Sequence, residues 1–326
     1  MALKTVLVIT VATYRMVFPG LSPIAPLPGV DRNAEPPATR SITMDLWSDA
    51  TADAQSSARV TVPAGLKLEG PVKLTVDLKW KPPASTPAST GTGDDGVFTS
   101  SYWGCGETIP QGQPKVSVSG QTPPDPTPSA PALPTGSYAY WPGYDGKPLK
   151  PEASAVGTYT LDANYGGTAS VTLGPEQDFL GTVHLVGVPK KFDLEKPLVV
   201  KWKPVPRALA YILNACGGNA GETVTWTSSA DRLAAQGIED RPVSASEITE
   251  LINAKVLLPP NATTCTIPSG IFKGSDSVFL TVTAIGADKV EIRGNVETRV
   301  LVRSTVSVPI AGTTYKPMPD PEGEKR

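Results

Sequence analysis

Residues 198–213 read LVVKWKPVPRALAYIL, and this stretch decides which kind of fold the chain adopts. Apolar residues occupy every second position up to Trp202. A period of two residues places one row of side chains on each face of a β-strand. Pro204 and Pro206 cannot donate to a strand ladder, so they end this strand and mark a corner. The apolar run at residues 211–213 then begins a second, neighbouring strand.

Short apolar runs rich in β-branched residues recur along the chain, and they indicate an all-β protein. Residues 223–227 (TVTWT) and 278–285 (VFLTVTAI) show the same alternation as the opening stretch. Comparable runs lie at residues 42–47, 58–62, 72–80, 97–103, 115–119, 157–161, 169–173, 182–186, 264–267 and 296–308. The chain has 326 residues, a length that predicts about two or three domains with ample core.

Several short motifs follow one another in a fixed order within residues 192–310. A strand with Trp and Pro-Val precedes a strand with Ala-Tyr, and a Thr-Ile-Pro strand leads into one that ends in Ala and Gly. The residues concerned are Leu198, Trp202, Pro204, Val205, Ala210, Tyr211, Thr266, Ile267, Pro268, Val282, Ala284 and Gly286. This succession resembles fibronectin type III and related immunoglobulin-like sandwiches. The resemblance implies two packed antiparallel sheets, and no particular activity, because the fold hosts many functions.

One segment departs from the pattern of a simple sandwich. Residues 228–263 are far longer than a loop between two sandwich strands needs to be. Ser244 and Glu247 form a capping box, and Ile248 and Leu251 follow at helical spacing. We therefore expect a short helix in an insertion at residues 229–257. The insertion is either a cap on one end of the sandwich or a lid that binds a partner.

Two stretches of the chain match each other. Residues 60–82 (VTVPAGLKLEGPVKLTVDLKWKP) and 185–204 (LVGVPKKFDLEKPLVVKWKP) both contain Val-Pro, Leu-Glu-x-Pro and Lys-Trp-Lys-Pro in the same order. The first copy has four more residues before its tryptophan. The match indicates a duplicated module, with chance likeness between strands as the alternative. Duplication predicts tandem antiparallel sandwiches, module 1 at residues 41–119 and module 2 at residues 191–312.

Proline-rich segments flank these two modules. Residues 21–40 read as an extended arm, and residues 120–136, with six prolines between positions 121 and 135, read as a semi-rigid linker. A β-rich aromatic segment follows at residues 137–190. The polar stretch at residues 313–326 reads as a loose tail.

Residues 1–20 have two interpretations. Lys4 and the following TVLVITVAT resemble the basic start and short apolar centre of a secretory signal peptide. The same run is rich in Val, Ile and Thr, which suits a strand. A strand at this position, without an obvious local partner, could complete the sheet of a neighbouring copy of the chain.

The densest aromatic cluster is YAYWPGY, which contains Tyr138, Tyr140, Trp141 and Tyr144. Trp103 is a further candidate member of this group. Such residues are enriched in interfaces between domains or subunits, and flat rings also stack on sugars. The cluster is therefore an interface, a joint between modules or a carbohydrate platform, or it has no role in binding.

The three cysteines show no C-x-x-C spacing. In the resembled sandwich, the strands that hold Cys216 and Cys265 belong to opposite sheets. The resemblance therefore implies a disulfide between Cys216 and Cys265, with two buried free thiols as the alternative. Cys105 is then left over, either exposed or paired between chains.

Groups that support catalysis or cofactor binding are scarce. His184 is the single histidine, which removes most histidine-based acid–base schemes and histidine-rich metal sites. No phosphate-binding or dinucleotide-binding motif is present, so we predict neither an enzyme nor a cofactor nor a metal site. A net charge of −2 favours neither nucleic acid nor an anionic membrane as partner. No stretch is long and apolar enough to suggest a membrane span.

These features together predict a secreted, non-catalytic structural protein. We expect a subunit of a surface filament, fibre or layer, with other copies of itself or other surface proteins as partners. Tandem sandwiches are usual in surface adhesins and fibre subunits, so this expectation rests on analogy. The alternative is a carbohydrate-binding or adhesion accessory protein that uses the aromatic cluster. A hydrolase with a pair of carboxylates is a third, weaker reading.

Overall fold

A computed structural model describes residues 4–17, 37–81, 98–118, 133–143, 148–189, 192–219 and 221–311. The described residues are mostly β-strand, with a single α-helix, so the all-β prediction is confirmed. The elements are β1 (Thr5–Met16), β2 (Thr39–Ser48), β3 (Ala58–Thr61), η1 (Ala64–Leu66), β4 (Val72–Val76), β5 (Phe98–Trp103), β6 (Lys115–Val118), β7 (Ser137–Trp141), β8 (Gly157–Ala163), β9 (Gly167–Leu173), η2 (Pro175–Gln177), β10 (Leu198–Lys201), β11 (Ala210–Asn219), β12 (Glu222–Thr227), α1 (Ala245–Asn253), β13 (Thr264–Ile267), β14 (Ser277–Ile285), β15 (Lys289–Arg293) and β16 (Val296–Ala311).

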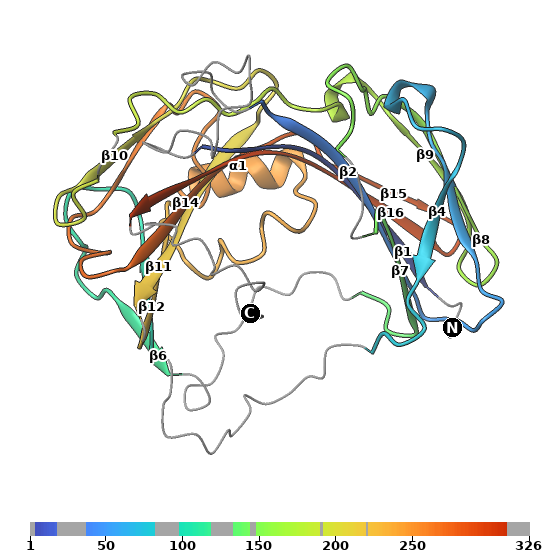
Figure 1. Cartoon of the computed structure of the whole chain (residues 1–326), viewed down its shortest axis with the longest axis horizontal. Helices are drawn as coiled ribbons and strands as arrows, with labels where there is room; N and C mark the ends of the chain where they lie inside the picture. The colour runs from blue at the N-terminus through green and yellow to red at the C-terminus, as the bar shows by residue number, and fades with distance from the viewer. Residues whose placement is uncertain are drawn as a thin grey trace, which may run out of the picture.

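One large mixed sheet organises the molecule. It has 14 strands in the order β6-β5-β12-β11-β14-β16-β1-β2-β7-β4-β3-β8-β9, and β15 pairs with β16 beside this path. Figure 1 shows the sheet bent into an arch, with β10 on its outer side and α1 on its inner side. We call the inner side the concave face. The main core lies on the opposite side of the sheet and includes buried residues from both halves of the chain.

The centre of the sheet is a parallel pair formed by β1 and β16. Twelve residue pairs join the two strands, from Thr5↔Val296 to Met16↔Ser307. The other edge of β1 is occupied by β2, which runs antiparallel to it. Alternate residues of β1, such as Ile9 and Val11, are fully buried in the main core. This pair therefore joins the N-terminal and C-terminal halves of the sheet.

The C-terminal half is a two-layer arrangement. Antiparallel β14, β11 and β12 continue the sheet outward from β16, and β10 pairs with β13 in a separate two-stranded sheet. Trp202, directly after β10, packs its ring 5.4 Å from the ring of Tyr211 on β11. The Oη atom of Tyr211 accepts a 2.7 Å hydrogen bond from the backbone N–H of Val205. The corner that Pro204 and Pro206 predicted is therefore held against the larger sheet.

The N-terminal half curls round on itself. The sheet runs from β2 through β7 and β4 to β3, β8 and β9, all in antiparallel pairs. Strand β9 returns close to β15 and β16, and Lys289 on β15 donates a 2.7 Å hydrogen bond to the carbonyl oxygen of Thr172 on β9. Buried side chains from β8, including Tyr159 and Leu161, fill the inside of the curl.

The helical insertion packs on the concave face, as Figure 1 shows. Helix α1 begins where the capping box predicted it, because the Ser244 side chain accepts a hydrogen bond from the backbone N–H of Glu247. A second, smaller core joins the insertion to the sheet, and it contains Ile248 of α1 together with Ile212 and Ile285 of the sheet. A hydrophobic face at helical spacing thus covers part of the sheet.

A buried arginine fixes this insertion to the central strand. Arg303 of β16 forms a two-pronged ion pair with Asp288, with N–O distances of 2.7 and 2.9 Å. The same guanidinium donates to the carbonyl oxygens of Glu239 (3.0 Å) and Arg241 (2.8 Å). The side chain of Asp288 is 1% exposed, and its oxygens also accept hydrogen bonds from the backbone N–H groups of Val243 and Val302. A buried pair satisfied in this way is costly to break.

Three sequence-based expectations differ from the structure. The sheet is continuous and includes parallel pairs, so the two halves are not plainly separate antiparallel modules. Strands β5 and β6, expected in module 1, pair in the C-terminal half because β5 runs parallel to β12. Residues 5–16 form a strand with both edges occupied within its own chain, so β1 does not complete a neighbour's sheet. Most of the proline-rich arm and linker and the tail at residues 313–326 lie outside the described residues.

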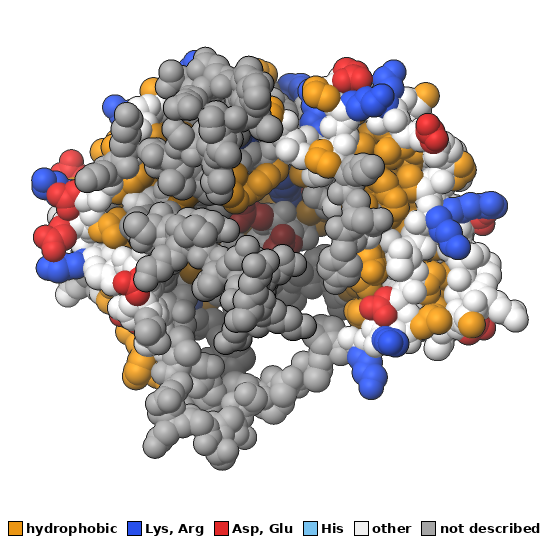
Figure 2. All heavy atoms as spheres, viewed as in Figure 1, with side chains coloured by type: hydrophobic (Ala, Val, Ile, Leu, Met, Phe, Trp, Pro, Cys, Tyr) orange, Lys and Arg blue, Asp and Glu red, His pale blue; other side chains and the backbone are white. Residues whose placement is uncertain are grey.

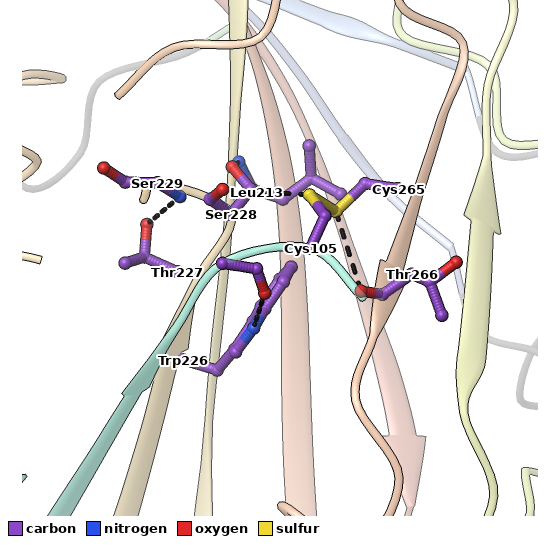
Figure 3. Close-up of a disulfide and its surroundings, with 9 residues drawn as sticks. Cys105, Leu213, Trp226, Thr227, Ser228, Ser229, Cys265 and Thr266 are labelled. Carbon is purple, nitrogen blue, oxygen red and sulfur yellow. Dashed lines mark hydrogen bonds between the residues drawn. A yellow bond between two sulfur atoms is a disulfide. The ribbon is translucent and has the colours of Figure 1, made fainter. Parts of the chain in front are cut away.

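The predicted disulfide between Cys216 and Cys265 is wrong. Cys265 of β13 instead pairs with Cys105, across a sequence separation of 160 residues (Figure 3). Cys105 lies just after β5, where Gly104 accepts a 3.0 Å hydrogen bond from Trp226 Nε1 and Gly106 donates to the carbonyl oxygen of Thr266. This segment therefore crosses from the large sheet to the small one, and the disulfide joins the two layers.

Cys216 is a free, exposed thiol on the concave face. Its neighbour Ala215 and the alternate residue Leu213 are buried in the main core. Strand alternation therefore turns Cys216 away from β13, and this is the physical reason for the different pairing.

Candidate functional site: the concave face of the sheet

The concave face carries two features on either side of the helical insertion. One is a group of aromatic rings in the N-terminal half. The other is a polar groove in the C-terminal half. Figure 2, which has the same view of the arch as Figure 1, shows apolar side chains gathered over the N-terminal half and charged side chains mostly around the rim of the molecule, with a few acidic ones near the centre.

Four rings form the aromatic patch, which we define as Trp47, Trp80, Tyr138 and Tyr140. Tyr138 is at its centre, with ring centroids 5.2 Å from Trp47, 6.0 Å from Trp80 and 5.6 Å from Tyr140. Tyr138 and Tyr140 are stacked, with an angle of 18° between their planes. Ala139 between them is fully buried, so the two tyrosines lie on the face turned away from the main core. All four rings are half-buried.

One carboxylate lies beneath these rings. Tyr138 Oη donates a 2.6 Å hydrogen bond to Asp45 Oδ1 on β2. Burial raises the pKa of the Asp45 carboxyl above 3.8, and the hydrogen bond from Tyr138 opposes part of that rise. Burial, together with the hydrogen bond to Asp45, raises the pKa of Tyr138 as well. The hydrogen bond fixes the ring of Tyr138 against the sheet.

The structure separates the aromatic residues that the sequence grouped together. Trp141 packs against the main core, because alternation along β7 turns it to the opposite face from Tyr140. Trp103 is on β5, seven strands away from β7 in the sheet order. Tyr144 lies outside the described residues. Trp47 and Trp80 were missed, although alternation with buried Leu46 could have placed Trp47 on this face.

The polar groove lies over four neighbouring strands, β5, β12, β11 and β14. Its floor consists of two rows of residues in direct register across these strands. One row is Ser101, Thr225, Cys216 and Phe279, and the next is Trp103, Thr227, Asn214 and Thr281. All of these except Trp103 line a cavity of about 380 Å³. Small hydroxyl and amide groups therefore dominate the floor.

The rim of the groove comes from the helical insertion. Arg232, Ala235 and Gln236 line the same cavity. The guanidinium of Arg232 lies 5.7 Å from the centre of the Trp103 ring, a cation–π contact at one end of the floor. Phe279, which is 43% exposed, lies at the other end. Among the described lining residues, Arg232 carries the only charge.

Groups on the described part of this face that could react include the Cys216 thiol and the Asp45 carboxyl. Within the described ranges, no group of His, Cys, Asp and Glu side chains is arranged to hold a metal ion. His184 lies outside both features, and its Nδ1 atom is 3.0 Å from Arg15 Nη1. The part of the chain that the structure describes contains no helix long and apolar enough to cross a membrane. The two features offer aromatic rings, hydroxyl and amide groups and, at Cys216, a free thiol.

No protein-family model matches the sequence, and no curated protein matches it at a significant level.

Proposed function

We propose that this chain is a non-catalytic structural protein of an extracellular filament, fibre or layer, and that it carries tension along its length. The observation that carries the proposal is the parallel pairing of β1 with β16. Because the two strands run in the same direction, a pull at Thr5 and a pull at Ala311 act on opposite ends of the pair.

Such a pull loads the ladder in shear. The hydrogen bonds between parallel strands run across the strand direction, so force along the strands acts on all twelve residue pairs together. Separation from one end would instead break the pairs one at a time. A shear arrangement at the centre of a continuous sheet suits a protein that transmits force.

Two further features support an extracellular setting and a sandwich architecture. The disulfide between Cys105 and Cys265 ties the two layers of the C-terminal half, and stable disulfides are typical of oxidising compartments. The residues of the fibronectin-like resemblance, such as Trp202, Tyr211 and Val282, lie in the main core. We propose that the C-terminal half is a sandwich of this type, merged with a second half through β1 and β16.

The state of assembly tests this function. Negative-stain microscopy and light scattering of the native material should reveal ordered fibres, rings or sheets of this chain. Monomers near 34 kDa at all concentrations would contradict an assembling role.

The aromatic patch favours a second candidate, a carbohydrate-binding accessory protein. Stacked, half-buried rings offer the flat apolar surfaces on which sugar rings stack. In that case the chain should stay monomeric and be retained on immobilised glycans. Replacing Tyr140→Ala should abolish the retention, whereas Trp141→Phe, a change on the opposite face, should leave it intact.

A further inference from the structure

We propose that the polar groove between the helical insertion and strands β5, β12, β11 and β14 binds a short oligosaccharide. This site is separate from the aromatic patch, and the proposal does not depend on the role in tension. It follows from three properties of the groove, namely its hydrogen-bonding capacity, its length and its pre-formed rim.

Two of the four hydroxyl groups of the floor, those of Thr225 and Thr281, donate their protons within the protein. Thr225 Oγ1 donates to Ser101 Oγ at 3.1 Å, and Thr281 Oγ1 donates to the carbonyl oxygen of Asn214 at 3.2 Å. A hydroxyl oxygen that has donated retains lone pairs that can accept. The floor therefore presents acceptors at Thr225 and Thr281 next to the hydroxyl groups of Ser101 and Thr227, and it suits a ligand rich in O–H groups, which donate and accept. A saccharide supplies such groups.

The backbone hydrogen-bonding groups of the floor strands are already used within the sheet, so a ligand on this face must be recognised by side chains. Strands β12, β11 and β14 are paired on both edges, so their ladders offer no free backbone groups to an added peptide strand. Thr225, Cys216 and Phe279 lie in one row across three neighbouring strands, and a ring lying on the sheet could contact all three.

The ends of the floor define how long the ligand is. Trp103 with Arg232 lies at β5, and Phe279 lies at β14. Three strand spacings of about 4.8 Å separate these strands, or about 14 Å in total. That span suits a short oligosaccharide rather than a single sugar. Phe279 can stack on a ring at one end, and the cation–π pair of Trp103 and Arg232 bounds the other end.

The rim is held in place before any ligand arrives. Asp231 Oδ1 accepts hydrogen bonds from the backbone N–H groups of Leu233 and Ala234, which fixes the turn that carries Arg232. Asn214 of the floor donates a 2.7 Å hydrogen bond to Glu239 of the insertion. The contacts of Arg303 with Glu239 and Arg241 secure the same segment. A pre-formed site avoids the cost of ordering its walls on binding.

Cys216 provides a direct readout, because it lies on the floor and is the free thiol of a chain with three cysteines. The rate at which iodoacetamide alkylates Cys216 in the full chain should be measured with and without short cello-, xylo-, chito- and galacturono-oligosaccharides. At least one of these should slow alkylation in a saturable way. Titration calorimetry with Cys216→Ser should then give the same affinity without the thiol.

Matched variants locate the binding. Thr225→Val removes a floor hydroxyl while keeping a β-branched shape, and it should weaken binding about five- to tenfold. Phe279→Ala should weaken it about tenfold or more. Thr172→Val on β9 and Tyr140→Ala in the aromatic patch should leave the affinity unchanged.

Two results would overturn the proposal. One is that no oligosaccharide in the panel slows the alkylation of Cys216. The other is that binding survives both groove variants or disappears with Tyr140→Ala, which would assign it to the aromatic patch. Neither result affects the role in tension, since that role depends on β1 and β16 and is measured by force.

Discussion

The tryptophans of the two Lys-Trp-Lys-Pro motifs lie in different environments, one in the main core and one in the aromatic patch. Trp202, in the second copy, follows β10 directly and is 2% exposed in the main core. Trp80, in the first copy, follows a turn after β4 and lies half-buried beside Tyr138 in the aromatic patch. A short identical motif therefore does not fix the environment of its tryptophan.

The four additional residues of the first copy explain the difference. Strand β4 ends at Val76, and Trp80 donates a backbone hydrogen bond to the carbonyl oxygen of Asp77, which closes a turn. The Asp77 side chain also accepts a hydrogen bond from the backbone N–H of Lys79. In the second copy, alternation continues from Val200 to Trp202 without a turn, so both side chains enter the core.

Replacing the two tryptophans is the strongest test of this comparison. Trp202→Ala should lower the free energy of unfolding by about 3–5 kcal/mol, because it opens a large cavity next to Tyr211. Trp80→Ala should lower it by about 1 kcal/mol or less, because the ring is partly solvated. Denaturant titration of both variants measures the contrast, and equal losses would show that the two environments are not different.

The disulfide between Cys105 and Cys265 stabilises the layer that contains the second copy of the Lys-Trp-Lys-Pro motif. Cys265 lies on β13, which pairs with β10, the strand that leads into Trp202. Cys105→Ser should lower the free energy of unfolding by about 2–5 kcal/mol through loss of the cross-link. Cys216→Ser is the matched control and should change it by less than about 0.5 kcal/mol. If reductant destabilises wild type and Cys105→Ser equally, the cross-link is not the cause.

A tyrosine hydroxyl forms a hydrogen bond near each copy of the motif, that of Tyr211 near the second copy and that of Tyr138 near the first, and the two bonds should differ in their contribution to stability. Tyr211→Phe should cost about 1–2 kcal/mol, because it leaves the buried N–H group of Val205 without its partner. Tyr138→Phe near the first copy should cost less than about 1 kcal/mol, because water can reach the half-buried Asp45. Thermal unfolding followed by circular dichroism would resolve the two, and a larger loss for Tyr138→Phe would reverse the proposed ranking.

The smallest expected effect is a pH dependence at the aromatic patch. The pKa of Asp45 is raised in the folded protein, so the folded state holds the proton more tightly than the unfolded chain. The stability that Asp45 contributes should therefore fall as pH rises above about 3.8 and level off above the folded pKa. Asp45→Asn should lack this fall.

The measurement is the free energy of unfolding of wild type minus that of Asp45→Asn, between pH 3 and 7. A difference that increases with pH would mean that the pKa is lowered instead of raised.

Local features of this fold could be predicted from the sequence, because local rules determine them. The strand at Leu198–Lys201 follows from alternation, and helix α1 follows from the capping box at Ser244. The outward direction of Cys216 was also available from alternation with Leu213 and Ala215. The resemblance indicates which sheet each cysteine belongs to, but it does not indicate on which face of that sheet the side chain lies.

Long-range pairing could not be predicted in the same way. Nothing in β1 or β16 by itself indicates that they pair in parallel across almost the whole chain. The parallel pairing of β5 with β12 likewise depends on the packing of the entire C-terminal half. The polar groove combines residues from β5, β12, β11, β14 and the insertion, so it becomes visible only when those pairings are known.

Single-molecule pulling tests the central claim most directly, with two attachment geometries in a Cys216→Ser background. In the first, force is applied through the chain that precedes β1 and the chain that follows β16, so that the pair is loaded in shear. In the second, it enters through the N-terminal end and a thiol introduced by Arg293→Cys, at the exposed last residue of β15 just before β16, and separates the pair from one end.

The account predicts a clearly higher unfolding force in the shear geometry. Equal forces in the two geometries would contradict a role for the β1–β16 pair in carrying tension.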